Sequence, residues 1–257
     1  SGTTGSINLV AFSFGETFVN KGDEIIVSES EHHSNIVPWQ MLCQRKGAVL
    51  RVLHVDEDGH LNLEELKSLL NPKTRIVAVT QISNVLGILN PVKEIVSVCH
   101  SVGCPVLIDG AQGMVHEGVD VQDVDCDFYA FSGHKLYAAT GTGVLYGKRK
   151  WLDQMVPYQG GGEMIATVRF SGTTYAPLPE KFEAGTQNIN AIPTLEPAIE
   201  MLKLMKDKEL LNAQEAVSQY LLHALTSNPR IRLYGVPRGT ETKIPLFSFS
   251  VEGAHHE

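Results

Sequence analysis

A lysine that follows a serine and a histidine, just past a strand-like run, has the clearest chemical potential in this sequence. The apolar run Phe128–Phe131 leads into Ser132, Gly133, His134 and Lys135. By position alone Lys135 would be a solvated surface lysine. Hydroxyl and imidazole groups beside it suit a bound phosphate, and an amine held next to an aldehyde forms a Schiff base. We therefore predict that Lys135 bonds covalently to a phosphate-bearing aldehyde.

An aspartate ends a second apolar run and supplies the opposite charge. Val106–Ile108 is followed by Asp109, and ligands of open α/β sheets bind at the carboxyl ends of strands. Such an aspartate can also cap the next helix. In pyridoxal chemistry, a carboxylate there keeps the ring nitrogen protonated, so that the ring accepts electrons. Lys135 and Asp109 together predict pyridoxal 5'-phosphate as the cofactor.

Two weaker motifs fit the same cofactor. Thr4 lies in Gly2–Gly5, and small hydroxyl-bearing residues at a helix start direct N–H groups toward an anion, although many threonines there are only caps. His32 and His33 are adjacent, so their side chains point in different directions and no metal site is predicted. We favour an imidazole that stacks on a flat cofactor.

The elements that must position these residues alternate between strand-like and helix-like patterns. This alternation predicts an α/β domain around a largely parallel sheet. Two helices carry clear boundary signals, Asn62 before residues 63–70 and Pro91 at the start of residues 91–101. The predicted strands are residues 24–27, 49–55, 75–79, 106–108, 128–131 and 143–146.

The pattern changes after Gly162. Residues 163–192 are predicted to be an irregular loop, followed by helices over 194–206 and 209–227 and by short strands over 231–234 and 246–251. We therefore predict a large cofactor-binding domain over residues 1–193. Residues 194–257 are predicted to be an incomplete, small α+β domain.

Composition excludes several classes of protein. The 257 residues carry a formal net charge of −8, which argues against a nucleic-acid-binding surface. No apolar run is long enough to span a bilayer. Four cysteines without metal-type spacing do not form a disulfide framework in a chain of this length, and they indicate a reducing compartment, by default the cytoplasm.

Five segments together carry a family resemblance. The chain resembles the class V aminotransferase branch of the fold-type I pyridoxal-phosphate enzymes and, within it, the group II cysteine desulfurases, which are also selenocysteine lyases. The resemblance implies a mainly parallel seven-stranded sheet with flanking helices, plus part of a small α+β domain. The segments are residues 32–39 (HHSNIVPW), 83–87 (SNVLG), 108–112 (IDGAQ), 126–135 (CDFYAFSGHK) and 182–186 (FEAGT).

The resemblance also implies roles around the cofactor ring. Lys135 holds the cofactor as a Schiff base and moves protons at the substrate Cα, while His32 stacks on the ring, and these two are the predicted catalytic residues. Asp109 pairs with the ring nitrogen. Gln112 donates a hydrogen bond to the phenolic oxygen, and Asn84 lies near the ring and the substrate.

Further implied roles concern the phosphate and the second subunit. Thr4, Ser132 and His134 are expected to hold the phosphate. A threonine that matches Thr186 reaches the phosphate from the other subunit in this family, so a homodimer with shared sites is implied.

The implied activity converts L-cysteine, or L-selenocysteine, to L-alanine and passes sulfur as a persulfide to an acceptor protein of iron–sulfur cluster assembly. The family's sulfur-accepting cysteine and carboxylate-binding arginine match no residue here. We therefore expect a chain truncated at both ends that is inert alone. Two alternatives remain: another class V enzyme, such as an aminotransferase or a kynureninase-like hydrolase, or a cofactor-binding module without turnover.

Overall fold

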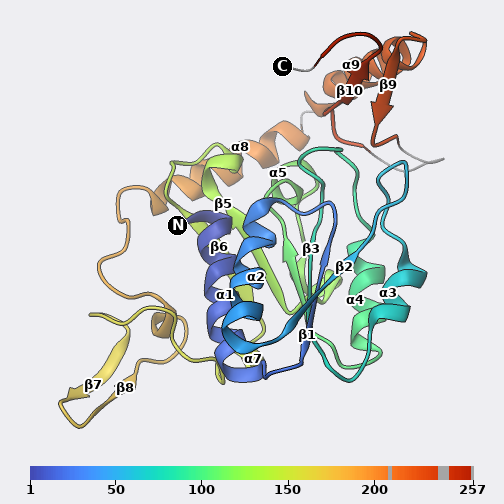
Figure 1. The fold of residues 1–257 in the computed structure, drawn as a ribbon. Helices are drawn as coiled ribbons and strands as arrows, with labels where there is room; N and C mark the ends of the chain where they lie inside the picture. Colours follow the sequence, from blue (N-terminus) through green and yellow to red (C-terminus); the bar gives the residue numbers. More distant parts are fainter. Residues whose placement is uncertain (208–209, 237–242, 256–257) are drawn as a thin grey trace.

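A six-stranded sheet forms the centre of the structure, a computed structural model that describes residues 1–207, 210–236 and 243–255 (Figure 1). Strands β1 to β5 are parallel, and β6 pairs antiparallel with β5. The order across the sheet is β2 (Val49–Leu53), β1 (Glu24–Ser28), β3 (Thr74–Thr80), β4 (Val106–Asp109), β5 (Phe128–Ser132) and β6 (Gly143–Gly147).

Helices cover both faces of this sheet. Helices α1 (Gly2–Phe18) and α2 (Val37–Lys46) pack on one face, and α3 (Leu63–Leu69) and α4 (Val92–His100) pack on the other. Each face has its own buried cluster of apolar side chains. Because both faces are covered, β1 and β4 are buried at every position, which explains why their sequences are apolar runs without alternation.

Short helical segments make the remaining connections around the sheet. Several of them lie where a strand ends, so they shape the loops at the edges of the sheet. They are η1 (His33–Asn35), α5 (Gly113–His116), α6 (Val121–Val124), η2 (Gly133–Leu136), α7 (Arg149–Leu152), η3 (Glu180–Phe182) and η4 (Ile192–Thr194).

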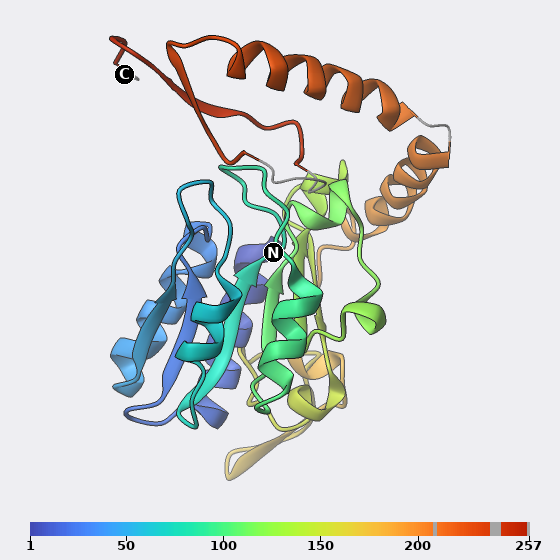
Figure 2. The ribbon, with the colours of Figure 1, turned by 90° about the vertical axis from the view of Figure 1, so that its right-hand side faces the viewer.

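The last part of the chain adds two longer helices and a strand pair. Helices α8 (Leu195–Asp207) and α9 (Leu210–Thr226) precede β9 (Ile231–Tyr234) and β10 (Ser248–Val251), which pair antiparallel. Figures 1 and 2 place α9, β9 and β10 at the end of the molecule where the parallel strands have their carboxyl ends. A bridge between Ile88 and Lys243 connects this part to the large sheet's loops.

All six predicted strands before residue 150 are confirmed, as are the four predicted helices, within a few residues at their ends. The cap before α3 is also confirmed, since the Asn62 side chain accepts hydrogen bonds from the backbone N–H groups of Glu64 and Glu65. Glu65 does not complete a reciprocal capping box. Its carboxylate instead accepts hydrogen bonds from His54.

Two predictions are wrong. The sheet has six strands in the described residues, not seven, because the seventh came only from the resemblance and no remaining strand joins this sheet. Residues 163–192 are not wholly irregular, since β7 (Ile165–Arg169) and β8 (Gly172–Tyr175) form an antiparallel hairpin. Both faces of this hairpin are mostly exposed, so its sequence lacks the apolar alternation that would have predicted it.

Candidate active site

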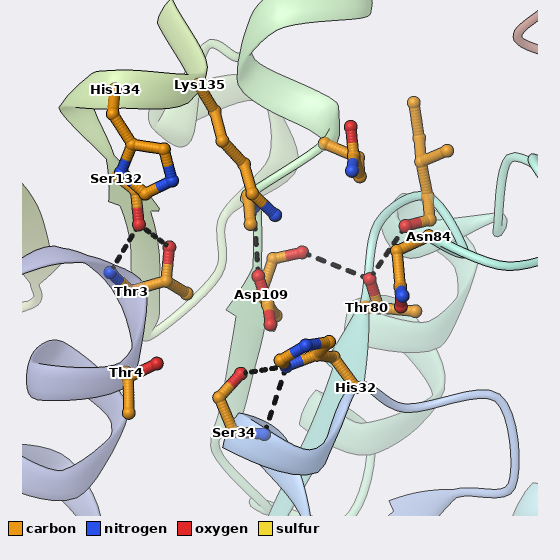
Figure 3. A pocket seen from close by; sticks show the side chains of 13 residues that line it. Thr3, Thr4, His32, Ser34, Thr80, Asn84, Asp109, Ser132, His134 and Lys135 are labelled. Atoms are coloured by element: carbon orange, nitrogen blue, oxygen red, sulfur yellow. Dashed lines mark hydrogen bonds between the residues drawn. The ribbon is translucent and has the colours of Figure 1, made fainter. Parts of the chain in front are cut away.

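A cavity of about 240 Å³ opens at the carboxyl ends of the parallel strands (Figure 3). Eight of the nine predicted site residues line it, although they are spread over more than 130 positions of the sequence. Thr186, the ninth, is exposed and does not line the cavity. The lining residues are Thr3, Thr4, His32, Ser34, Thr80, Ile82, Asn84, Asp109, Ala111, Gln112, Ser132, His134 and Lys135.

The order of the strands in the sheet explains why these residues meet. Strands β3, β4 and β5 lie side by side and parallel, so their last residues reach the same edge. Thr80, Asp109 and Ser132 are those last residues, and Thr80 pairs directly with Asp109. Five lining residues were not predicted: Thr3, Ser34, Thr80, Ile82 and Ala111. For Thr80, its place at the end of a predicted strand was the available signal.

Asp109 is a buried carboxylate, with 2% of its surface exposed. Its Oδ1 accepts a hydrogen bond of 2.9 Å from the Ala111 backbone, and no other hydrogen bond to its carboxylate is present in the described residues. Burial raises the pKa of Asp109, and the Ala111 N–H and the charges of Lys135 and His32 only partly oppose that rise. A buried carboxylate with so few donors is suited to a cationic, hydrogen-bonding ligand.

Lys135 lies in η2, directly after β5, and is half-buried. Its side chain extends into the cavity toward Asp109 (Figure 3). The short helix is packed closely, because a Cβ on Gly133 would lie 2.3 Å from the Thr142 hydroxyl. The backbone that carries the amine is therefore fixed, while the amine itself lies in the cavity.

His32 approaches from the opposite side of Asp109 (Figure 3). Its Nδ1 accepts a hydrogen bond of 3.1 Å from the Ser34 backbone N–H and lies 2.8 Å from the Ser34 hydroxyl. A neutral imidazole that accepts at Nδ1 carries its proton on Nε2. The turn at His32 therefore fixes both the ring orientation and the tautomer.

The amino end of α1 forms a third wall. The Thr3 backbone N–H donates to the Ser132 hydroxyl at 2.8 Å, and the two hydroxyls are also 2.8 Å apart. These bonds join α1 to the end of β5 and leave the exposed Thr4 hydroxyl at the cavity. Close approach needs glycine at Gly143, where a Cβ would lie 2.4 Å from the Cα of Gly2.

A buried pair braces the turn that carries Asp109 and Gln112. The Tyr129 hydroxyl donates to the Gln81 side chain at 2.6 Å. Added Cβ atoms would collide with this pair, at 2.0 Å from Tyr129 for Gly110 and 2.0 Å from Gln81 for Gly113. The Asp-Gly-Ala-Gln-Gly turn is therefore shaped by the neighbouring strands.

The four cysteines lie elsewhere. Cys43, Cys99, Cys104 and Cys126 are all free, as predicted; they are also buried, and none of them lines the cavity. Burial raises the pKa of Cys99 and Cys126 to about 12, which keeps these thiols protonated. Across the described residues, no group of three or more His, Cys, Asp or Glu side chains is placed to hold a metal ion, and no helix is long and apolar enough to cross a membrane.

Comparison with known proteins agrees with this geometry. The family model described as aminotransferase class-V matches residues 1–257. The chain belongs to the class V aminotransferase family. Among its relatives in this family, it is 49% identical over 256 residues to a cysteine desulfurase of Enterobacter sp. (strain 638), an alignment that covers 99% of this chain and 62% of that protein. The chain thus spans about 62% of that relative's length.

Solved structures of similar proteins give the same assignment. The cysteine desulfurase CsdA of Escherichia coli, in its S-sulfonic acid form, superposes with a TM-score of 0.89 and 40% identity, covering 99% of this chain and 63% of that chain. A C-DES mutant with glycine covalently linked to its PLP cofactor superposes with a TM-score of 0.77 and 25% identity, covering 97% and 66% of the two chains. The predicted fold class and family are therefore confirmed.

The residues that line the cavity have the groups needed for four tasks. A primary amine can bond an aldehyde, a buried carboxylate can hold a cation, and a flat imidazole can stack on a ring. Hydroxyl and imidazole groups of Thr4, Ser132 and His134, together with the start of the long helix α1, can hold an anion. These residues fit a phosphorylated aromatic aldehyde.

Proposed function

We propose that this chain is the cofactor-binding part of a pyridoxal-phosphate-dependent cysteine desulfurase, which converts L-cysteine to L-alanine. The observation that carries the proposal is the meeting of the Lys135 amine and the buried Asp109 carboxylate in one cavity. Similarity to cysteine desulfurases over almost the whole chain supports the choice of substrate. The PLP cofactor in the C-DES structure supports the choice of cofactor.

When bound, pyridoxal 5'-phosphate supplies an aldehyde carbon and an electron-accepting ring. Lys135 provides the amine that bonds that carbon and then moves a proton at the substrate Cα. Asp109 would hold the proton on the ring nitrogen, because burial raises the pKa of this carboxyl and a cation bound against it would stabilise its charged form. His32 presents its ring to one face of the cofactor. Asn84 and Gln112 supply amide groups at its rim.

We further propose that Thr4, Ser132 and His134 hold the phosphate at the start of α1. The Ser132 hydroxyl already bonds to Thr3, so it can offer only its remaining hydrogen-bonding capacity. Thr186 is exposed and does not line the cavity of its own subunit, which is consistent with a role in the site of a second copy. A homodimer with shared sites is part of this proposal.

Sulfur transfer needs a thiol that this chain does not present. In a desulfurase, an enzyme thiolate attacks the substrate sulfur, the Cβ–S bond of the substrate breaks with its electron pair going to the carbon side, and the sulfur stays on the enzyme cysteine as a persulfide. The four cysteines are buried and outside the cavity, so we expect no sulfide release from this chain alone. In the whole protein, the persulfide sulfur would pass to an acceptor protein of iron–sulfur cluster assembly.

Two organisational features belong to the same proposal. Residues 1–193 would form the cofactor-binding domain, and residues 194–257 would belong to a second, small domain. The Thr194 hydroxyl accepts a hydrogen bond from the Ala139 backbone at the point where the two parts join. Four reduced, buried thiols fit a protein of the cytoplasm.

An absorbance spectrum after incubation with pyridoxal 5'-phosphate tests the cofactor. We expect a visible band that survives desalting in the parent chain and is abolished in Lys135→Ala. Lys148→Ala is the matched control, because Lys148 lies at the opposite edge of the sheet and pairs with Asp125. A parent protein that stays colourless would contradict the proposal.

Product analysis tests the substrate and separates the rivals. Incubation of the loaded chain with L-cysteine and a thiol reductant should give neither sulfide nor a keto acid. Addition of L-cysteine should nevertheless shift the visible band. Formation of a keto acid would instead indicate an aminotransferase, and an unchanged spectrum would indicate a cofactor-binding module that does not take L-cysteine.

A further inference from the structure

Glu31 is a buried acid beside the site that the roles described above do not use. It follows β1 and immediately precedes His32, and 8% of its surface is exposed. Burial raises the pKa of Glu31 to about 8, despite hydrogen bonds from Ser28, Asn35 and Thr80, and the charge of Asp109 adds to the rise. Burial of an acid costs free energy of folding, so its presence beside the site suggests a role there.

Both carboxylate oxygens of Glu31 connect separate elements. Oε1 accepts a hydrogen bond of 2.8 Å from the Thr80 backbone N–H at the end of β3, and another from the Ser28 hydroxyl. Oε2 accepts a hydrogen bond of 2.7 Å from the Asn35 amide. Asn35 in turn accepts a bond of 3.0 Å from the Trp39 indole N–H. These hydrogen bonds connect the turn of residues 32–35 to the edge of the sheet beside Asp109.

The direction of this hydrogen-bonded chain is fixed at both ends. An indole N–H and a backbone N–H can only donate, so Glu31 must accept on both oxygens. Of the groups bonded to Glu31, only the Ser28 hydroxyl oxygen can accept a hydrogen bond from the O–H of the neutral acid. Glutamine cannot replace Glu31, because its NH2 group would face the NH2 group of Asn35. If the Asn35 amide flipped to avoid this, its NH2 group would face the Trp39 indole N–H.

The imidazole of His32 depends on this turn. Its side chain is exposed, and among the described residues its Nδ1 forms hydrogen bonds only within the turn, with Ser34. Thr80, which Glu31 grips, pairs in register with Asp109. The position of the His32 ring relative to Asp109 therefore depends on the hydrogen bonds of the Glu31 carboxyl.

We propose that Glu31 is a positioning residue, which locks the turn of residues 32–35 onto β3 so that the His32 imidazole faces the cavity opposite Asp109. For the stacking of His32 on the cofactor, this inference rests on the proposed function. The position and tautomer of His32 in the cofactor-free chain do not depend on it, so they can be tested separately.

The decisive variants exchange one atom type at a time. Glu31→Gln breaks the chain of hydrogen bonds at constant size. Glu31→Gln combined with Asn35→Asp restores it, because the new carboxylate accepts from both the new amide and the Trp39 indole. Asn35→Asp alone completes a double-mutant cycle. His32→Gln identifies the His32 signals in spectra.

The first measurement uses the cofactor-free chain. Long-range ¹H–¹⁵N spectra should place the proton of neutral His32 on Nε2 in the parent. Glu31→Gln should give a mixture of tautomers, and the double exchange should restore the parent spectrum. An unchanged His32 spectrum in Glu31→Gln would overturn the inference, whether or not the chain binds pyridoxal phosphate.

The second measurement uses the chain loaded with pyridoxal 5'-phosphate. Loss of one buried hydrogen bond should weaken retention of the cofactor about tenfold in Glu31→Gln and reduce the visible circular dichroism by about half. The double exchange should return both within about twofold. A purely structural role would lower the unfolding midpoint without changing these signals in the folded protein, and that result would count against positioning. A parent chain that binds no cofactor would refute the proposed function, and the tautomer result would still decide the role of Glu31.

Discussion

The pKa values of buried acidic residues shift in opposite directions at the two edges of the central sheet. At the amino edge, the guanidinium groups of Arg75 and Arg51 pair with Asp23 and Glu24, respectively, and lower the pKa values of these carboxyl groups. At the carboxyl edge, burial raises the pKa values of Asp109 and Glu31. The acids of the first edge form ion pairs with arginines, whereas no ion pair of Asp109 or Glu31 is present among the described residues.

Asp127 and Asp109 make this contrast sharpest, because they lie at opposite ends of neighbouring strands and are almost equally buried. Burial tends to raise the pKa of Asp127, but hydrogen bonds from Trp151 at 2.7 Å and His100 at 2.8 Å outweigh it and the pKa is lowered. Asp109 has one backbone donor. The comparison teaches that a satisfied buried acid stabilises the fold, while an unsatisfied one marks a site that awaits a ligand.

The largest effect on stability should come from Asp127→Asn. Removing one partner from a buried cluster of charges should lower the free energy of unfolding by about 3 kcal/mol. Urea unfolding at neutral pH measures it. The pKa of Asp127 is lowered in the fold, so the stability that it contributes is present at neutral pH and is lost as pH falls. The difference between parent and variant should therefore shrink in acid.

Asp109→Asn should show the reverse pattern. If Asp109 holds the proton of the ring nitrogen as proposed, loss of its carboxylate should lower retention of pyridoxal phosphate about 100-fold, or about 2.7 kcal/mol. The cofactor-free variant should be as stable as the parent or more so, because its folded state no longer contains an unpaired buried acid. Equal losses of stability in Asp109→Asn and Asp127→Asn would erase the difference between the two edges.

Glu31→Gln should change the slope of stability with pH. The pKa of Glu31 rises from 4.5 to about 8 on folding, so the folded state keeps a proton that the unfolded state releases. Stability therefore falls as pH rises between these values, by up to about 1.4 kcal/mol per pH unit. Urea unfolding from pH 5 to 8 should show a flatter profile in the variant, and parallel profiles would contradict the buried proton.

Asp125→Asn should have the smallest effect. Asp125 pairs with Lys148 near Asp127, but it is exposed, so its ion pair should contribute at most about 0.5 kcal/mol. Its φ of 57° suits asparagine, so the backbone should not change. Thermal unfolding in low and high salt would measure this contribution. A loss as large as that of Asp127→Asn would show that burial does not govern the amino edge.

Local patterns were enough where one element decides its own structure. The apolar runs predicted the strands, because covered strands are apolar along their length, and Asn62 predicted the start of α3 because a cap is a local bond. The hairpin of β7 and β8 was missed because an exposed strand pair leaves no apolar periodicity. The seventh strand had no basis in these residues.

The sequence by itself determined which residue types could do the chemistry: a lysine after a strand, an aspartate at a strand end, a histidine before a short turn. Motifs at strand ends predict a shared edge because parallel strands of one sheet end on the same side. Only the tertiary structure decided what each acid experiences. Burial raises the pKa values of Glu31 and Asp109, and hydrogen-bond donors lower the pKa of Asp127. Both effects come from distant parts of the chain. Desolvation and hydrogen bonding depend on those three-dimensional neighbours, and no local pattern records them.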